Sequence, residues 1–382
     1  MGQKNSKKVI YFKNQLIGNG DFLQSNTVTD CRQIYLDLLD LDMAYIEKAC
    51  MKLDQCYNLD HLSISLYYKN QFMYSIAKTL AKLQKLINLK IEFAIEDTSD
   101  IDYCSLCLLN QVRISESLIL IFNLMKNFNS TECKSLYSQL SSIENLTDLQ
   151  ILKNGDYPYY FAELSQNLRK CQKLTKLTLG SIDQVRDLNT IGLLNQISNL
   201  QELHLQVKNI TPQQTQQIVH QLNQFPKSCS LHLNLKQIKE ELNLYEVIDE
   251  FRLCKTLTAL NLSMCQNTEM PKLGLHLGQI ENLQSLMIFC LGQSKIVCTE
   301  GELLSGIQHC KNLKHLTVSF GFEQFYYNPK NPQSFGLMGC KNLNTLKFVI
   351  NHQNIYIKLG LQRVFRNLKK LKKLVNIQLV ID

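Results

Sequence analysis

Leucines and other apolar residues recur along the chain at one set of spacings. One copy has apolar residues at Cys171, Leu174, Leu177 and Leu179, which gives the form Φ-x-x-L-x-x-L-x-L. Successive copies are 26 to 31 residues apart, and a fixed period of this length indicates stacked repeats. A degenerate earlier copy predicts a strand at residues 34 to 39. The remaining copies have their first apolar residue at Cys56, Leu83, Val112, Ile143, Ile197, Phe225, Cys254, Ile280, Cys310, Cys340 and Leu371.

Each copy contains two segments with different periods. The L-x-L segment alternates apolar and polar residues, as a short strand with one buried face does. Ahead of the first apolar residue, further apolar residues lie three and seven positions back, as Leu168 and Leu164 do before Cys171. That spacing is typical of an amphipathic helix. A strand and a helix in about 29 residues cannot bury their apolar faces alone, so the copies are expected to stack into a solenoid.

These leucine positions resemble leucine-rich repeats, and the period with its helical second half is similar to the ribonuclease-inhibitor-like subclass. The resemblance implies an α/β solenoid of about 12 to 13 repeats, a horseshoe or arc with a parallel sheet on its concave face and helices on its convex face. Strands lie about 4.8 Å apart and helices about 10 Å apart, so the stack is expected to curve. Residues 31 to 382 are predicted to form this single domain, and residues 1 to 30 a tail and tether.

The resemblance also implies a scaffold whose concave face meets a protein partner. Residues expected on that face are mostly small or neutral, and they lack the stripe of Lys and Arg that nucleic-acid phosphates require. A loop with Phe325, Tyr326 and Tyr327 is a second candidate contact because exposed aromatic residues favour binding, although it could simply shield the core. The concave candidates are Lys176, Thr178, Glu202, His204, His232, Asn234, Asn261, Met287, Phe289, His315 and Thr317.

Composition places the chain among globular proteins. It has 382 residues, 45% hydrophobic and 19% charged, with only 15 Gly and 6 Pro, which excludes disordered and collagen-like chains. No apolar stretch approaches the roughly 20 residues of a membrane-spanning helix. Fourteen cysteines without an export signal favour free thiols in a reducing compartment. Several of them are the first residue of a copy, where a small apolar side chain is expected to serve equally well.

The formal charge of +8 conceals an uneven distribution. Residues 324 to 381 contain ten Lys or Arg and no Asp or Glu, whereas residues 14 to 323 contain 27 basic and 32 acidic residues. The last predicted helix therefore has a basic outer surface, which is either a solvated cap or a contact for anionic lipid, nucleic acid or an acidic protein. Its basic residues are Arg363, Arg366, Lys369, Lys370 and Lys373.

The N-terminus matches the N-myristoylation pattern, with Gly2 after Met1 and Ser6 four positions later. One myristoyl chain binds membranes with K of only about 10⁴ M⁻¹. Lys4, Lys7 and Lys8 near an anionic leaflet could add about 1 kcal/mol each. The sequence thus predicts a peripheral protein on the cytoplasmic face of a membrane. The alternative is a disordered polar tail on a soluble cytoplasmic protein.

Catalytic motifs are missing from the sequence: it has no nucleophile elbow, kinase signature, Walker loop or HExxH. His204 and His232 fall on neighbouring predicted strands, but two ligands do not make a zinc site. We therefore expect no metal, no cofactor and no small-molecule substrate. The sequence favours a non-catalytic protein-binding adaptor. The alternative is a soluble subunit of a nucleoprotein or regulatory complex that uses the basic C-terminal helix on nucleic acid or an acidic partner.

Overall fold

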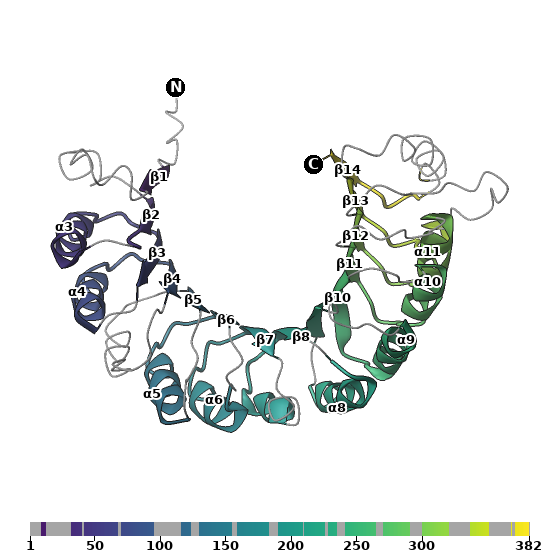
Figure 1. Cartoon of the computed structure of the whole chain (residues 1–382), viewed down its shortest axis with the longest axis horizontal. Coiled ribbons are helices and arrows are strands. Elements are labelled where there is room, and N and C mark those ends of the chain that lie inside the picture. Colours follow the sequence, from purple (N-terminus) through teal and green to yellow (C-terminus); the bar gives the residue numbers. More distant parts are fainter. Residues whose placement is uncertain are drawn as a thin grey trace. The chain divides into compact units, whose positions relative to one another are not determined.

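A computed structural model shows an α/β protein in which parallel strands alternate with helices (Figure 1). The chain divides into two compact units, residues 1–202 and 203–382, and each is described by itself. The fourteen strands found among the described residues follow one another in the sheet in chain order. The described residues are 9–12, 32–39, 42–67, 70–94, 116–123, 130–154, 159–182, 190–208, 210–225, 228–234, 241–264, 270–290, 300–320, 337–350, 368 and 371–381.

The first unit contains strands β1 to β7, which pair in parallel in chain order. Figure 1 shows α3 to α6 along one face of these strands. The strands are β1 Val9–Phe12, β2 Gln33–Asp37, β3 His61–Tyr67, β4 Asn88–Ala94, β5 Ser117–Asn123, β6 Asp148–Asn154 and β7 Lys176–Ile182. The helices are α3 Met43–Leu53, α4 Asn70–Leu80, α5 Ser130–Leu140, α6 Phe161–Leu168 and the 3₁₀ helix η2 Ile191–Gln196.

The second unit repeats the arrangement, with β9 to β14 paired in parallel and α8 to α11 along one face of its strands (Figure 1). The strands are β8 Glu202–Lys208, which begins on the last residue of the first unit, β9 Ser228–Asn234, β10 Leu257–Met264, β11 Ser285–Cys290, β12 His315–Phe320, β13 Thr345–Ile350 and β14 Asn376–Ile381. The helices are α8 Pro212–Leu222, α9 Glu241–Glu250, α10 Met270–Gly278, α11 Glu300–Ile307 and the 3₁₀ helices η3 Phe251–Leu253 and η4 Leu337–Gly339.

The predicted two-period repeat is confirmed in the strands and most helices. Leu177 and Leu179 of β7 are fully buried, as are Leu164 and Leu168 on the helix that precedes them. Helix α8 begins with a capping box, because Thr211 accepts a hydrogen bond from the Gln214 backbone N–H and the Gln214 side chain accepts one from the Thr211 N–H. The alternation of strands and helices was therefore predictable from the apolar spacing, and the parallel sheet agrees with what the resemblance implied.

Two local predictions differ from the structure. The segment predicted as a tail contains β1, whose Val-Ile-Tyr-Phe sequence suits a strand and which pairs with β2 from Val9 opposite Gln33. The turn before Ile197 is a 3₁₀ helix and not an α-helix. The prediction of one domain over residues 31 to 382 stays a prediction, since the two units are described separately.

Two cysteines at the first position of a copy contact the preceding repeat. The thiol of Cys310 donates to the carbonyl of Leu277 at the end of α10 (3.3 Å), and the thiol of Cys340 donates to Ile307 at the end of α11 (3.4 Å). Each carbonyl also accepts a backbone N–H, Leu277 from Ile280 and Ile307 from Cys310, so the thiols are additional weak donors between successive repeats. The expectation that a small apolar side chain would serve equally well stays a prediction.

Helices α10 and α11 approach each other through glycines. A Cβ atom on Gly306 would lie 2.1 Å from the carbonyl carbon of Gly274, and one on Gly274 would lie 2.4 Å from the carbonyl oxygen of Leu303. The backbones of the two helices are therefore in contact. Any larger side chain at Gly306 requires the helices to separate.

A buried lysine marks the end of β6. Lys153 is 1% exposed, and its Nζ lies 4.5 Å from the ring centroid of Tyr159, which is equally buried. The Tyr159 hydroxyl lies within hydrogen-bonding distance of the carbonyls of Ile151, at 3.0 Å, and Gly180. Stacking of Tyr159 on Phe161 ties this cluster to α6. The ring face favours the ammonium group inside an otherwise apolar core.

Candidate functional site

Within the described part of the chain, helices lie along one face of the strands and none lies on the other, which we call the open face. In β4 and β5 every second side chain is fully buried and the intervening ones are half-exposed. Parallel pairing in register places equivalent residues of neighbouring strands side by side, in rows that cross the sheet. A regular surface of partly exposed side chains therefore covers each unit.

In the second unit the structure brings together most of the predicted partner-contact residues. Met287 pairs in register with Asn261 on one side and Thr317 on the other. Phe289 lies in the same register as Ser263 and Ser319, and His315 as Ser285. These predicted residues are half-exposed, and His315 is exposed.

The predicted histidines lie on the open face without forming a metal site. His232 pairs in register with Asn261, and its Nε2 lies 3.1 Å from the Ser263 hydroxyl. His204 is half-exposed on β8, and Asn234 is in register with Ser263. Within the part of the chain that the structure describes, no three His, Cys, Asp or Glu side chains are grouped to hold a metal ion.

Three predicted residues belong to the first unit. Lys176 lies 3.7 Å from the Asp148 carboxylate on the neighbouring strand, and Thr178 pairs in register with Gln150. Glu202 is exposed at the start of β8. This region is therefore polar, and Lys176 is paired with an acidic side chain.

Sequence reasoning missed an aliphatic cluster on the open face of the first unit. Ile121 and Leu152 are directly opposite each other on β5 and β6, and Ile119 pairs with Gln150 one step away. All three aliphatic side chains are half-exposed. The signal was present, since residues 118 to 122 are apolar without alternation, so both faces of β5 are apolar.

An ion pair borders this cluster on the β4 side. Lys90 and Glu92 on β4 are in register with Ile119 and Ile121, and their charged groups lie 3.5 Å apart. Asn123 donates to Glu92 at 2.9 Å. The cluster thus has an apolar centre and a polar rim, the distribution found in protein–protein interfaces.

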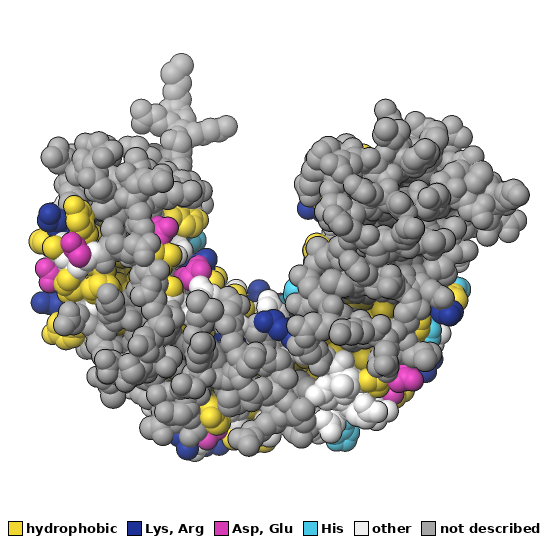
Figure 2. All heavy atoms as spheres, in the orientation of Figure 1, with side chains coloured by type: hydrophobic (Ala, Val, Ile, Leu, Met, Phe, Trp, Pro, Cys, Tyr) yellow, Lys and Arg dark blue, Asp and Glu magenta, His cyan; other side chains and the backbone are white. Residues whose placement is uncertain are grey.

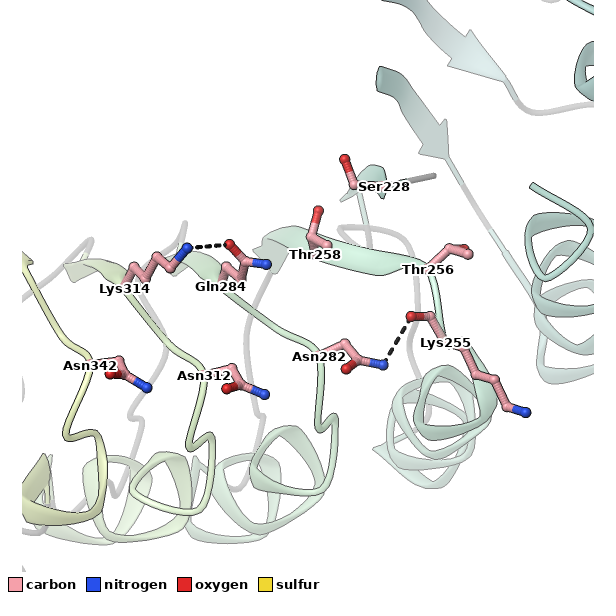
Figure 3. Close-up of a pocket in the computed structure, with 9 residues that line it drawn as sticks. All are labelled: Ser228, Lys255, Thr256, Thr258, Asn282, Gln284, Asn312, Lys314 and Asn342. Carbon is pink, nitrogen blue, oxygen red and sulfur yellow. Dashed lines mark hydrogen bonds between the residues drawn. The ribbon is translucent and has the colours of Figure 1, made fainter. Parts of the chain in front are cut away.

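A polar groove of about 440 Å³ lies along the strand starts of the second unit (Figure 3). The amides of Asn282, Asn312 and Asn342 lie in a row along it. Each donates to a backbone carbonyl of the preceding repeat, namely Lys255 (2.9 Å), Glu281 (2.9 Å) and Lys311 (3.0 Å). These asparagines hold successive repeats together at one corner.

The described thiols are unsuited to nucleophilic chemistry. Burial raises the pKa of Cys229, Cys310 and Cys340 to about 12. Each thiol is therefore protonated at neutral pH, and the thiolate is the reactive form.

Figure 2 shows two further surface features of the molecule. Hydrophobic side chains gather over α3 and α4, where Met51, Tyr57 and Tyr74 are 59%, 72% and 61% exposed. Uncharged polar side chains cover α8, which contains five glutamines. Neither feature includes a residue predicted as a site.

Several predicted sites lie outside the described residues. These are the lipidation site Gly2 with Lys4, Lys7 and Lys8, the aromatic loop with Phe325, Tyr326 and Tyr327, and the basic residues Arg363, Arg366, Lys369 and Lys370. Lys373 is described and exposed, and its Nζ donates to the Asn342 side-chain oxygen at 2.7 Å. No helix in the described part of the chain has the length and apolar character needed to cross a membrane.

Fold and site together define a repeat-like α/β protein with a parallel sheet and an open face. No protein-family model matches the chain, and a comparison with curated proteins also found no match.

Proposed function

We propose that this chain is a non-catalytic leucine-rich-repeat protein whose open face binds a protein partner. The repeat assignment is supported by leucines that occupy the same register position on successive strands, as Leu286, Leu316 and Leu346 do. It is also supported by helices along one face of the strands in each unit. A curved solenoid is the architecture we infer from these features.

The observation that carries the binding proposal is the aliphatic cluster of Ile119, Ile121 and Leu152. These side chains remain half-exposed on a sheet face, whereas their neighbours Leu118 and Leu120 are completely buried under the helices. Burial of apolar side chains at the centre of an interface supplies most of its binding energy, and a polar rim excludes water. The cluster and its paired charges match that organisation.

Site-specific photo-crosslinking in cells tests this proposal. A benzophenone amino acid at Gln150 lies between Ile119 and Leu152 in the open-face surface, whereas the same group at Ser138 of α5 is exposed on a helix of a neighbouring repeat. We expect a crosslinked protein from Gln150 and none from Ser138. Equal yields at the two positions, or a crosslink from Ser138 alone, would contradict the proposal.

A second variant identifies the residues responsible. The double substitution Ile119→Arg and Ile121→Arg should abolish a crosslink made from Thr178, which is on the open face of β7. The matched control is Lys134→Arg together with Ser138→Arg, which adds bulk and one charge to exposed positions of α5. A crosslink that survives the first variant would show that the aliphatic cluster is not the contact.

Attachment to the cytoplasmic face of a membrane through Gly2 remains part of the proposal on the strength of the sequence motif alone. The alternative role, in which the basic C-terminal segment contacts nucleic acid, is supported by the ten basic residues and no acidic ones between residues 324 and 381. It predicts RNA or DNA binding that weakens steeply with salt.

A further inference from the structure

The groove along the strand starts of the second unit lies between two rows of polar side chains. In each copy the first leucine lies three positions after the first apolar residue, as Leu283 does after Ile280. Residues directly before this leucine form the lower row, and residues directly after it form the upper row (Figure 3). Leu257, Leu283 and Leu313 between the rows are fully buried, so the residues on either side stand out from the surface. The lower row consists of Asn282, Asn312 and Asn342, and the upper row of Thr258, Gln284 and Lys314. Thr256 also lines the groove and occupies the position in its copy that the asparagines occupy in theirs.

A sequence change ends the groove at β9. Ser228 occupies the position of the first leucine in this copy, and Cys229 next to it is buried instead. The β9–β10 pairing accommodates the change with a bulge between Leu257 and Ala259. Ser228 consequently lines the groove where other copies have a core leucine.

The groove offers both hydrogen-bond donors and acceptors. Each asparagine uses one N–H to hold the preceding repeat. Within the described part of the chain, the second N–H and the Oδ1 of Asn282 and Asn312 have no protein partner. A primary amide that is fixed in this way can pair with a peptide group, which also has one donor and one acceptor.

Charge along this edge is strongly positive. None of the lining side chains is a carboxylate. Glu281 occupies the position directly after the first apolar residue of its copy, where neighbouring copies have Lys255 and Lys311. Its side chain lines a neighbouring hollow together with Arg252 and Lys311. The exposed lysines at this edge are Lys255, Lys311, Lys314, Lys341, Lys372 and Lys373.

These features distinguish between two kinds of anionic ligand. A phosphodiester chain presents only acceptors to the groove and normally gains affinity by stacking its bases on aromatic side chains. Among the described residues, no aromatic or arginine side chain lines the groove. A peptide main chain instead uses both functions of each amide, and acidic side chains can reach the lysines.

We propose that the groove binds an extended acidic peptide segment, whose main chain runs across the strands along the asparagine row and whose carboxylates contact the lysines of the edge. This site is separate from the open face. It adds a second protein-binding surface to the proposed scaffold and does not depend on the first.

Fluorescence anisotropy with defined probes tests the proposal on the full chain. The probes are a labelled twelve-residue peptide of alternating Glu and Ser, the same peptide with Gln for Glu, an acidic version N-methylated at every second residue, and a twelve-nucleotide oligouridylate. We expect the acidic peptide to bind at least tenfold more tightly than the Gln peptide and the N-methylated peptide. Its affinity should fall as salt rises, because exposed charges are screened.

Two sets of variants locate the site. Replacing Lys311, Lys314 and Lys341 by Gln should weaken binding of the acidic peptide about tenfold, since each surface ion pair contributes modestly. Replacing Lys48, Lys78 and Lys170 by Gln removes the same charge from exposed positions of the first unit and should leave affinity unchanged. Thr317→Arg on the open face should also have no effect, so a failure of the open-face proposal would not affect this result.

Three outcomes would overturn the proposal. Equal binding of the N-methylated peptide would show attraction by charge alone, without recognition of the main chain. Equal weakening by both triple variants would show dependence on net charge alone. Tighter binding of oligouridylate than of the acidic peptide would assign the edge to nucleic acid. Circular dichroism and urea midpoints equal to wild type establish that the variants are folded.

Discussion

Replacing Gly306 by Ala tests the close contact of α10 and α11. Helix propensity alone predicts that this change stabilises a helix by about 1 kcal/mol. The structure predicts the opposite sign. The added Cβ would lie 2.1 Å from the Gly274 carbonyl carbon and 2.3 Å from the Leu275 nitrogen, whereas carbon atoms in contact are normally about 3.5 to 4.0 Å apart.

The cost follows from what holds the helices in place. Leu303 and Ile307 of α11 and Leu273 and Leu277 of α10 are fully buried, so the helices cannot separate without disturbing the core. Overpacking of a core costs about 1 to 3 kcal/mol, and a collision between two backbones belongs at the upper end. After the gain in propensity, we expect Gly306→Ala to destabilise the protein by about 1 to 2 kcal/mol.

Urea unfolding followed by circular dichroism measures this difference. Ser305→Ala, next to Gly306 in the same helix, is the control and should change stability by less than about 0.5 kcal/mol. Gly306→Leu should be more destabilising than Gly306→Ala, because its side chain adds atoms beyond the Cβ. A Gly306→Ala protein as stable as wild type, or more stable, would refute the close approach of the two backbones.

Four further predictions address the core, the thiols and the N-terminus. Leu260→Asp buries a charge at a fully buried position and should unfold neighbouring repeats at urea concentrations that wild type tolerates, whereas Asn261→Asp on the open face should have a midpoint near wild type. Tyr159→Phe removes the hydroxyl that bonds the carbonyls of Ile151 and Gly180 and should cost about 1 to 3 kcal/mol in the same assay; no change would contradict the buried bond. Burial raises the pKa of Cys229, Cys310 and Cys340 to about 12, so these thiols should resist iodoacetamide at pH 8 until the protein is unfolded, as mass spectrometry of tryptic peptides can show. Because their folded pKa is above the unfolded value of 9.0, the free energy of unfolding should also fall as pH rises from about 9 to about 12. Gly2→Ala should move the protein from the membrane to the soluble fraction of a cell lysate, and identical fractionation of the two proteins would remove the lipid anchor from the proposal.

The apolar spacing predicted the repeat because burial decides both of its segments. Leu174, Leu177 and Leu179 face the core whatever the neighbouring polar residues are, and they fix where the strand lies and which face is covered. The same reasoning failed at Ser228, where a polar residue in a leucine position moves burial to Cys229 and adds a bulge. One substitution in the pattern altered the register, and only the structure shows how.

The open face was less predictable because its side chains have no burial requirement. Polar residues between strand leucines were recognised, so Thr317 and Met287 are where they were expected. The cluster of Ile119, Ile121 and Leu152 was missed since its apolar residues resemble core residues in the sequence. Alternation of apolar and polar residues along a strand identifies its exposed face only where the exposed side chains are polar.

The asparagines that tie the repeats together were also unexpected. Asn123, three residues after Leu120, donates to the Glu92 side chain and not to a backbone carbonyl. The repeated bond lies before the first leucine, as in Asn312 to the Glu281 carbonyl. A hydrogen bond between residues about thirty positions apart has no signature in local sequence until the stacking of repeats is known.

Lysine replaces asparagine at this corner in several repeats and makes an equivalent bond. The Nζ atoms of Lys85, Lys173 and Lys373 donate to the side-chain oxygens of Asn58, Asn145 and Asn342, at 2.8, 2.6 and 2.7 Å. Both residue types therefore keep one donor directed at the preceding repeat, while the length of a copy varies from 26 to 31 residues.

The geometry of this corner is the same in several repeats, and this has a functional consequence. Variation in length must fall in the helices and loops, since the strand starts are held in register by these bonds and by the leucines beneath them. A ligand that crosses several strand starts consequently meets donors at the regular spacing of parallel strands, about 4.8 Å. In the second unit the exposed lysines border the same corner, so the feature that aligns the repeats also gives the proposed peptide groove its regularity.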